Sequence, residues 1–258
     1  MASKPIHPLL KINPSSECRR VLVRVISLYK MPVYNDEKMT NSIEMIFMDE
    51  HETTIHVTVR KTLVGTFEKK IKEGSVYVFA YFSVGNRSGY YRTSRHDFRL
   101  NFQARTTVTE TRCDKIPLYG IRLVAFPEIL HADSNYPYLV DTMGILTATG
   151  NERDILRESK RTKMIVITLE AEGQRLDVTL FGEYVDLLKG FFRQAPLEHA
   201  VIVIQYAKVK MFQDRKLQKI WVTFGSLENL LNFSIENSDQ LLFRWRNPLR
   251  SWPIEVSA

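Results

Sequence analysis

Cationic and aromatic side chains gather in segment 87–95, which contains Arg87, Tyr90, Tyr91, Arg92 and Arg95. Guanidinium groups can bind phosphates, and flat phenol rings can stack on nucleobases. A groove that holds one nucleic-acid strand with little regard to base sequence needs both kinds of side chain. A solvated hairpin with ordinary surface arginines would give the same pattern. The segment alone therefore leaves both interpretations open.

The second half of the chain repeats this combination around one aromatic residue. Phe212 is surrounded by four cations, which are Lys208, Lys210, Arg215 and Lys216. Because the two segments occupy corresponding places in the two halves, this repetition is the most informative local feature of the sequence.

Strand alternation places further candidates on outward faces. If Ile55 and its alternate neighbours point inward, His56 and Arg60 point outward, and the same argument turns Phe181 outward at the end of its strand. A following helix or the neighbouring domain covering the Phe181 ring is the alternative. Tyr34, in a loop near two lysines, is a further candidate. Arg99 is expected on the outer face of its strand, away from the groove.

The sequence contains no recognisable catalytic or metal-binding constellation. Its glycines form no phosphate-binding loop, no Gly-x-Ser-x-Gly motif occurs, and the six histidines are scattered. The two cysteines, Cys18 and Cys113, cannot form a zinc cluster. Asp49, Glu50 and Glu52 indicate a solvated turn between strands. We therefore expect no enzyme activity, no cofactor, no metal and no membrane span.

The elements that must position these residues are short β-rich runs in two sets of five. The expected strands are 20–29, 42–49, 53–60, 76–84 and 98–109, then 139–149, 163–171, 175–181, 200–210 and 219–226. A helix is expected between the third and fourth strand of each set, at 61–72 and 183–192. This order is that of the OB-fold, a five-stranded Greek-key barrel. The sequence therefore predicts an all-β protein of two tandem OB-fold barrels with short helices.

Composition agrees with two globular domains. The chain has 258 residues, of which 44% are hydrophobic and 25% charged, so it can bury substantial cores. Its formal net charge of +7 favours an anionic partner without identifying one.

The expected domain boundaries follow from the strand sets. They are an N-terminal extension at 1–17, a first OB-fold domain at 18–112, a packed linker at 113–137, a second OB-fold domain at 138–232 and a C-terminal tail at 233–258. The linker combines three prolines with apolar residues, which predicts that it packs on one or both barrels. The tail could be a docking helix, a contact for protein partners or a connection to another module.

Several segments resemble the two central single-stranded-DNA-binding domains of the replication protein A large subunit, and look closest to the plant proteins related to that subunit. They are VDTMGILTATG at 140–150, VTLFGEYVDLLKGF at 178–191, AKVKMF at 207–212, TIHVTVRKTLVGTF at 54–67 and YYRTSRHDFRLNF at 90–102.

The resemblance implies binding of single-stranded DNA across both barrels, with aromatic stacking platforms at Phe181, Phe212 and Tyr91. Arg60 occupies the position of the fourth platform, where a guanidinium can lie flat on a base and also meet a phosphate. The resemblance further implies a nuclear protein that acts in DNA replication, repair or recombination.

Two other functions stay open. The barrels could bind a protein in the same groove after losing nucleic-acid affinity, as Arg60 in place of an aromatic residue would allow. They could also bind single-stranded RNA, because the sequence does not show whether a 2′-hydroxyl is tolerated.

Overall fold

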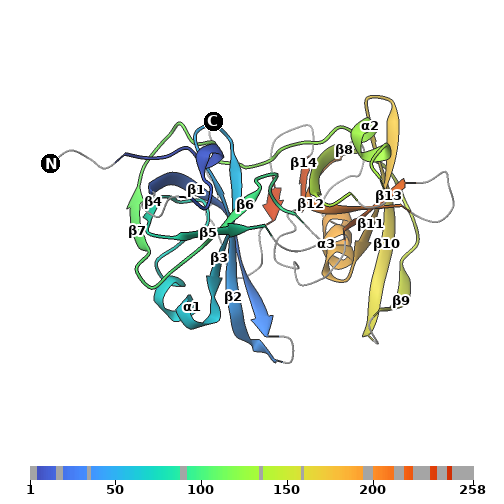
Figure 1. Cartoon of the computed structure of the whole chain (residues 1–258). Helices are drawn as coiled ribbons and strands as arrows, with labels where there is room; N and C mark the ends of the chain where they lie inside the picture. Colours follow the sequence, from blue (N-terminus) through green and yellow to red (C-terminus); the bar gives the residue numbers. More distant parts are fainter. Residues whose placement is uncertain are drawn as a thin grey trace. The chain divides into compact units, whose positions relative to one another are not determined.

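The computed structural model divides the chain into two units, Met1–Ile121 and Arg122–Ala258 (Figure 1). The residues that the structure describes are 5–15, 20–33, 36–87, 92–133, 136–157, 160–193, 200–211, 218–222, 233–236 and 243–245. Each unit is a curled sheet with its own apolar core.

The first unit is built on β1 (Arg20–Val33), β2 (Asp36–Met48) and β3 (Thr54–Arg60), which pair as an antiparallel meander. Four further strands are β4 (Val76–Ala80), β5 (Ser83–Asn86), β6 (Phe98–Asn101) and β7 (Thr107–Thr111). The sheet order is β5-β6-β3-β2-β1-β4-β7, and β6 runs parallel to β3. Because β5 continues the path of β4 and pairs β6, the sheet closes into the predicted OB-fold barrel.

The expected single strand at 76–84 is divided into β4 and β5. Tyr81, between them, has φ 60°, a left-handed conformation that a side chain adopts only when its surroundings impose it. The Thr106 hydroxyl donates a 3.0 Å hydrogen bond to the Tyr81 carbonyl oxygen at this break. The fifth predicted strand is likewise two strands, because β7 leaves β6 and pairs β4 instead.

Aromatic rings fill the first barrel. Phe47 and Phe79 stack with their centroids 4.5 Å apart, and Phe102 meets Phe67 edge to face at 5.0 Å. Phe67 belongs to α1 (Lys61–Phe67), which is shorter than the expected helix at 61–72. Each such ring contributes about 1.5–3 kcal/mol when fully buried.

The N-terminal segment completes this core. Leu9 begins the short 3-10 helix Leu9–Lys11, Ile12 follows it, and these two residues are 0% and 2% exposed. The Leu9 amide donates a 2.8 Å hydrogen bond to Asp49 Oδ2, and Asp49 Oδ1 accepts the amides of His51 and Thr53. Asp49 is 4% exposed, so the expectation that it lies in a solvated turn is wrong. It is buried because its carboxylate joins the turn to the N-terminal segment.

The second unit contains β8 (Leu139–Thr149), β10 (Lys160–Ala171), β11 (Gln174–Phe181), β12 (Val201–Met211) and β13 (Gln218–Val222). β8 pairs both β10 and β12, β11 pairs both β10 and β13, and β12 pairs β13, which closes a second barrel. β13 is parallel to β11, as β6 is to β3. β9 (Arg153–Arg157) adds a hairpin arm to β10.

Both fourth strands carry the same distortion. Tyr206 in β12 has φ 57° and lies five positions after the first residue of that strand, and Tyr81, which directly follows β4, lies five positions after the first residue of β4. The register of β12 against β8 shifts between Ile204 and Ala207, around this residue. A bulge there bends the strand and increases its twist, which helps β12 to pair β8 on one side and β13 on the other.

A helix covers the apolar interior of the second unit. α3 (Glu183–Phe192) matches the expected helix and buries Tyr184, Val185 and Leu188. Gly182 precedes it with φ 55°, which turns the chain from β11 into the helix. In the described part of the chain, no helix is long and apolar enough to cross a membrane.

The residues between the two barrels are divided between the units, and each part packs within its own unit. Ile116 is 1% exposed, and its carbonyl oxygen accepts the Arg24 guanidinium at 2.9 Å. Phe126, in α2 (Phe126–Leu130), belongs to the second core. The buried Asp141 carboxylate accepts the amides of Arg122 and Tyr206, each at 2.9 Å.

The C-terminal segment adds two short strands to the second sheet. β14 (Phe233–Glu236) pairs β12, and β15 (Phe243–Trp245) pairs β14. The described residues of the tail, 233–236 and 243–245, extend the sheet, while the rest of the tail, where a docking helix was one alternative, lies outside the described residues.

Replacing Asp49 with alanine tests how the N-terminal segment is held. We expect Asp49→Ala to lower the free energy of unfolding by about 1–3 kcal/mol, because the buried Leu9 amide loses its acceptor. Hydrogen exchange of that amide should accelerate. Urea denaturation measures the first effect, with Glu50→Ala at the exposed neighbouring position as control. Equal stability of the two variants would contradict this account of the segment.

Candidate nucleic-acid interface

The outer face of β3 positions the first group of candidate residues. Ile55, Val57 and Val59 are fully buried in the barrel, while His56 is partly exposed and Arg60 is exposed. The alternation predicted from the sequence is therefore confirmed for this strand. Thr54 and Thr58 share the outward face with His56 and Arg60.

Parallel pairing sets β6 beside this face. His56 is the register partner of Arg99, so these two side chains project from adjacent strands on the same side of the sheet. The expectation that Arg99 lies away from the groove is wrong. The fifth strand of the barrel is the neighbour of the third, and an outward residue on one lies next to an outward residue on the other.

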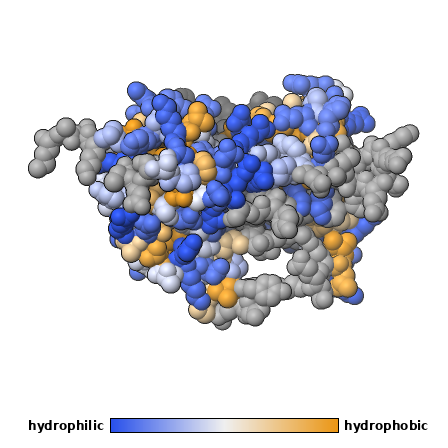
Figure 2. Space-filling view, viewed as in Figure 1, coloured by the Kyte–Doolittle hydropathy of each residue, from blue (hydrophilic) through white to orange (hydrophobic). Residues whose placement is uncertain are grey.

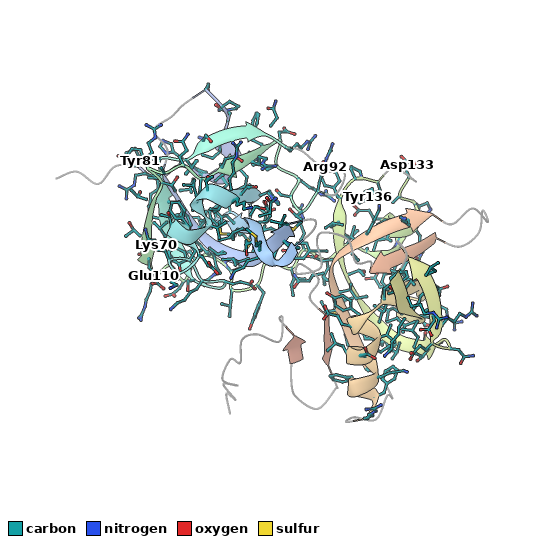
Figure 3. All side chains as sticks on the ribbon, turned by 90° about the horizontal axis from the view of Figure 1, so that it is seen from below. Lys70, Tyr81, Arg92, Glu110, Asp133 and Tyr136 are labelled. Carbon is teal, nitrogen blue, oxygen red and sulfur yellow. The ribbon has the colours of Figure 1, made fainter. Side chains whose placement is uncertain are left out.

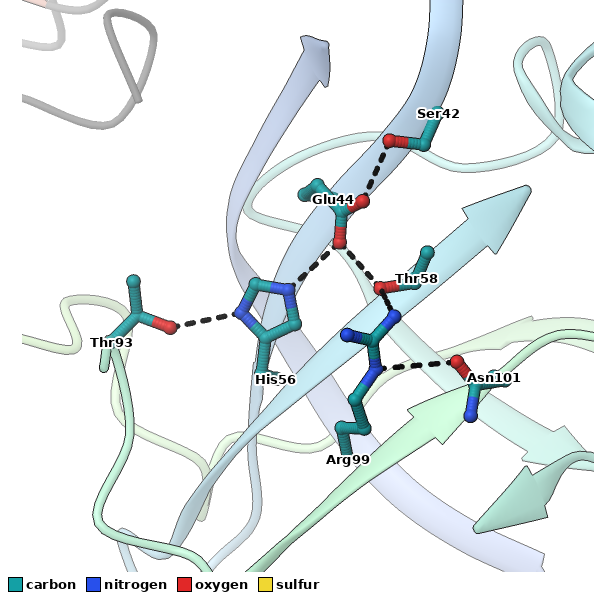
Figure 4. A network of polar contacts seen from close by, with 7 residues as sticks. All are labelled: Ser42, Glu44, His56, Thr58, Thr93, Arg99 and Asn101. Carbon is teal, nitrogen blue, oxygen red and sulfur yellow. Dashed lines mark hydrogen bonds and ion pairs between the residues drawn. The ribbon is translucent and has the colours of Figure 1, made fainter. Parts of the chain in front are cut away.

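Glu44, from β2, joins the two strands through a network of polar contacts (Figure 4). Its Oε2 lies 2.8 Å from His56 Nε2 and also accepts the Thr58 hydroxyl. The carboxylate can only accept, so His56 Nε2 carries the proton. Thr58 Oγ1 in turn accepts Arg99 Nη2 at 2.9 Å, and Arg99 Nε donates to Asn101 Oδ1 at 3.3 Å.

The network holds Glu44 ionised. Burial alone would raise the pKa of its carboxyl group, but hydrogen bonds from His56, Ser42 and Thr58, together with the His56 charge, outweigh burial and lower the pKa below its ordinary value. Nearby, burial and then the Glu44 charge raise the pKa of Tyr29 far above its usual range, so its phenol stays protonated. Glu44 is thus a fixed negative charge beneath the outward face.

Residues 92–98, the described part of the chain just before and at the start of β6, fold over this face and are held there. The Ser94 hydroxyl donates to the Thr54 carbonyl oxygen at 2.6 Å, and Thr93 Oγ1 lies 3.0 Å from His56 Nδ1. The Phe98 amide donates to His96 Nδ1, which leaves the proton on His96 Nε2 for the Leu9 carbonyl oxygen at 2.9 Å. Residues 92–98 are therefore fixed to both β3 and the N-terminal segment.

A hollow lies between this loop and the two strands. It is lined by His56, Arg87, Arg92, Thr93, Ser94, His96, Phe98 and Arg99. Three of these residues are arginines, and none of the described lining residues is acidic. Arg87 forms an ion pair with the exposed Asp97 at 3.3 Å. Figure 3 labels Arg92 on the first unit, and the described surface in Figure 2 is mainly hydrophilic.

The hollow gathers three of the residues predicted from the sequence, His56, Arg87 and Arg92. Arg60 and Arg95 are exposed outside it. In the second unit Lys208 and Lys210 alternate with the buried Val209, which places them on the outward side of β12. The predictions that lie outside the described residues are Tyr34, Tyr90, Tyr91, Phe212, Arg215 and Lys216.

Phe181 does not have the exposed ring expected from alternation. It is 2% exposed, and all four residues from Val178 to Phe181 are buried. Alternation predicts exposure only where one face of a strand meets solvent, and both faces of this strand end are covered. The ring is therefore covered, which is the alternative that the sequence left open, and its role as a stacking platform stays a prediction.

Sequence reasoning missed several residues of the hollow, namely Thr93, Ser94, His96, Phe98 and Arg99. A signal for Arg99 was present, because outward residues of the third and fifth strands must be neighbours once the barrel closes. No comparable signal marked the loop residues, whose places depend on contacts with Thr54, His56 and Leu9. Among the described residues, no group of three or more His, Cys, Asp or Glu could hold a metal ion.

The lowered pKa of Glu44 gives a pH-dependent prediction. At neutral pH, Glu44→Gln should lower the free energy of unfolding by about 1–3 kcal/mol, because the buried donors lose a charged acceptor. The wild-type contribution is complete above the ordinary carboxyl pKa of 4.5 and is lost as pH falls through the lowered folded-state pKa. The difference between the two proteins should therefore narrow below about pH 4.5.

Denaturation of both proteins between about pH 3 and pH 7 measures this difference, with Glu110→Gln on the exposed side of β7 as control. A difference that stays constant over the whole range would show that the charge of Glu44 does not stabilise the fold.

Comparisons with known proteins agree with the fold. The family model described as "Domain of unknown function DUF223" matches residues 10–132, and no curated protein sequence matches the chain. A replication protein A heterotrimer bound to ssDNA contains a chain of similar structure, with a TM-score of 0.57 and 19% identity over 90% of this chain. The present chain spans about half, 52%, of that chain.

Two further solved structures are less similar. DNA-binding domain A of S. cerevisiae replication protein A has 17% identity and a TM-score of 0.35, over 43% of this chain and 98% of its own. The p202 HIN1 domain in complex with a 12-mer dsDNA has 12% identity and a TM-score of 0.42, over 83% and 95%. The heterotrimer chain is therefore the structural likeness that bears on the fold, and it agrees with two tandem OB-fold barrels.

Proposed function

We propose that this chain binds single-stranded DNA with little base specificity, and that the hollow of the first unit is a principal contact. The observation that carries the proposal is the convergence of three arginines and two histidines on the outer face of an OB-fold barrel. OB-folds bind oligonucleotides on this side of the barrel, across the second and third strands and the adjoining loops.

The proposed interaction is mainly with the phosphates. Arginine side chains stay protonated in proteins, so the hollow is cationic at any ordinary pH. Arg60, exposed at the end of β3, extends the same outward face beyond His56 and Thr58. A strand bound along β3 would thus meet guanidinium groups at successive positions, and its counterions would be released into solution.

Base stacking is the second part of the proposal. Tyr91 and Phe212 are the aromatic residues that the sequence places in the two loops, and each stacked base would contribute about 1–3 kcal/mol. Arg60 would take a base in place of an aromatic ring. The buried Phe181 would first have to become accessible, so we assign it no stacking in the structure described.

The proposed activity suits places where DNA strands are separated, which include replication, repair and recombination in the nucleus. The narrower resemblance to plant proteins related to the replication protein A large subunit stays a prediction. So does any contact of the C-terminal segment with protein partners.

Binding to labelled oligonucleotides tests the proposal. An OB-fold covers about 4–16 nucleotides, so oligonucleotides of about 30 nucleotides suit the two barrels. We expect fluorescence anisotropy to give salt-dependent binding, with a log–log slope of about −0.7 for each phosphate contact. Arg92→Ala should weaken binding and make the slope shallower by about 0.7. Arg105→Ala removes an exposed arginine of the same unit outside the hollow and should bind as wild type.

Competition by duplex DNA and by RNA tests whether binding is specific for single-stranded DNA. Duplex DNA of the same sequence should compete poorly, and RNA of the same sequence separates DNA binding from general single-strand binding. If the folded, monodisperse chain binds no oligonucleotide at low salt, the proposal is wrong. The barrels would then be candidates for protein recognition, and a partner search would follow.

A further inference from the structure

We infer that the hollow of the first unit takes a terminal phosphate monoester of a nucleic-acid strand, so that the chain prefers strands with a phosphorylated end. This inference rests on the proposed function and adds a specificity to it. It depends on four features of the hollow, which are its fixed walls, its volume, its donors and its charge.

The walls of the hollow are held in place by hydrogen bonds. Ser94 is bonded to the Thr54 main chain, Thr93 lies against His56, and His96 bridges the Phe98 amide and the Leu9 carbonyl oxygen. On the strand side, Arg99 is held by Thr58 and Asn101. A site whose donors are already oriented binds an anion without a large loss of conformational entropy.

The volume of the hollow favours one phosphate over a base. The cavity measures about 40 Å³. A single water needs about 10–15 Å³ on this scale, so the hollow admits roughly three oxygen-sized groups. A terminal phosphate carries three such oxygens, whereas a nucleobase ring system is larger than the space. The strand would therefore enter the hollow by a phosphate and leave its bases outside.

The donors around this space match the acceptors of a phosphate. Three guanidinium groups line it and supply its donors, because the Ser94 hydroxyl already donates to the Thr54 carbonyl oxygen, and the Thr93 hydroxyl and both imidazoles already have partners in the walls. Two carboxylates lie nearby, and both already have partners in the structure. Glu44 accepts from Ser42, His56 and Thr58, and Asp97 pairs with Arg87 from an exposed position. The charge facing the hollow is therefore positive.

The charge of the phosphate distinguishes the end of a strand, which can carry a monoester, from its interior, which carries diesters. A phosphate monoester carries about −1.5 to −2 at pH 7, because its second pKa is about 6, and it presents three acceptor oxygens. A diester within the strand carries one negative charge and two free oxygens. A cationic hollow gains more from the monoester, since charge-assisted hydrogen bonds to guanidinium groups are stronger than neutral ones.

The test compares strands that differ only at their ends. Three oligodeoxythymidylates of about 30 nucleotides, with an internal fluorophore, would carry a 5′-phosphate, a 3′-phosphate or two hydroxyl ends. We expect the intact chain to bind one phosphorylated strand about tenfold more tightly than the hydroxyl strand. This advantage should shrink as pH falls below about 6, where the monoester gains a proton.

Variants locate the preference in the hollow. Arg99→Ala should abolish the advantage of the phosphorylated strand, and Arg99→Lys should restore only part of it, because lysine lacks the planar pair of donors. Thr93→Val removes the contact that holds the loop to His56, so it should reduce the advantage while removing no charge. Arg105→Ala is the matched control and should keep the full advantage. Thermal melting of each variant checks that its fold is intact.

Competition by inorganic phosphate tests whether the hollow recognises the phosphate group itself. At matched ionic strength, it should reduce the advantage of the phosphorylated strand when it occupies the same hollow, while leaving the binding of the hydroxyl strand unchanged. Loss of both kinds of binding would instead indicate general screening and would count against a site in the hollow.

Two results would overturn the inference in different ways. Equal affinity for all three strands would refute end recognition while leaving the proposed function intact. Binding of none of the strands by the folded chain would refute both. A phosphorylated-strand advantage that survives in Arg99→Ala and Thr93→Val would place end recognition elsewhere and would also contradict the inference.

Discussion

Parallel pairing between β3 and β6 is the constraint on which the first unit depends. It closes the barrel, and it aligns His56 with Arg99 so that one buried carboxylate, Glu44, can serve both strands through Thr58. Without that register the guanidinium would have no anchored partner, and the loop over β3 would lose its contact with His56. The pairing that closes the barrel therefore also brings together the residues that line the hollow.

Much of the architecture follows from local sequence patterns. The eighth strand and α3 occupy the residues expected, because 139–149 alternates and 183–192 has a strong helical period. The missed elements are short. α2 begins with Phe126 and Pro127, and a proline in the first turn is compatible with a helix, although its neighbours predicted a linker. β7 and β14 depend on partners distant in sequence, which no local pattern reports.

The part of the candidate site on β3 was predictable from strand alternation alone. Alternation identified His56 and Arg60 on β3, whose inner residues are fully buried. Alternation did not predict the burial of Phe181, because both faces of that strand end are covered. It also did not predict that Arg99 lies beside His56, because that depends on which strands pair. Asp49 shows a similar limit. An acidic residue in a turn is predicted to be exposed unless the backbone amides that donate hydrogen bonds to it are known.

The anchoring of Leu9 has a consequence for the order in which the first unit can form. Leu9 precedes every strand of the first unit in the sequence, but its amide bonds Asp49 and its carbonyl oxygen bonds His96. Both hydrogen bonds can therefore form only after the chain has been synthesised as far as residue 96. The segment is thus made before β1 but completes its contacts after most of the barrel strands have been made. A fragment that begins at β1 would expose apolar core surface that Leu9 and Ile12 normally cover.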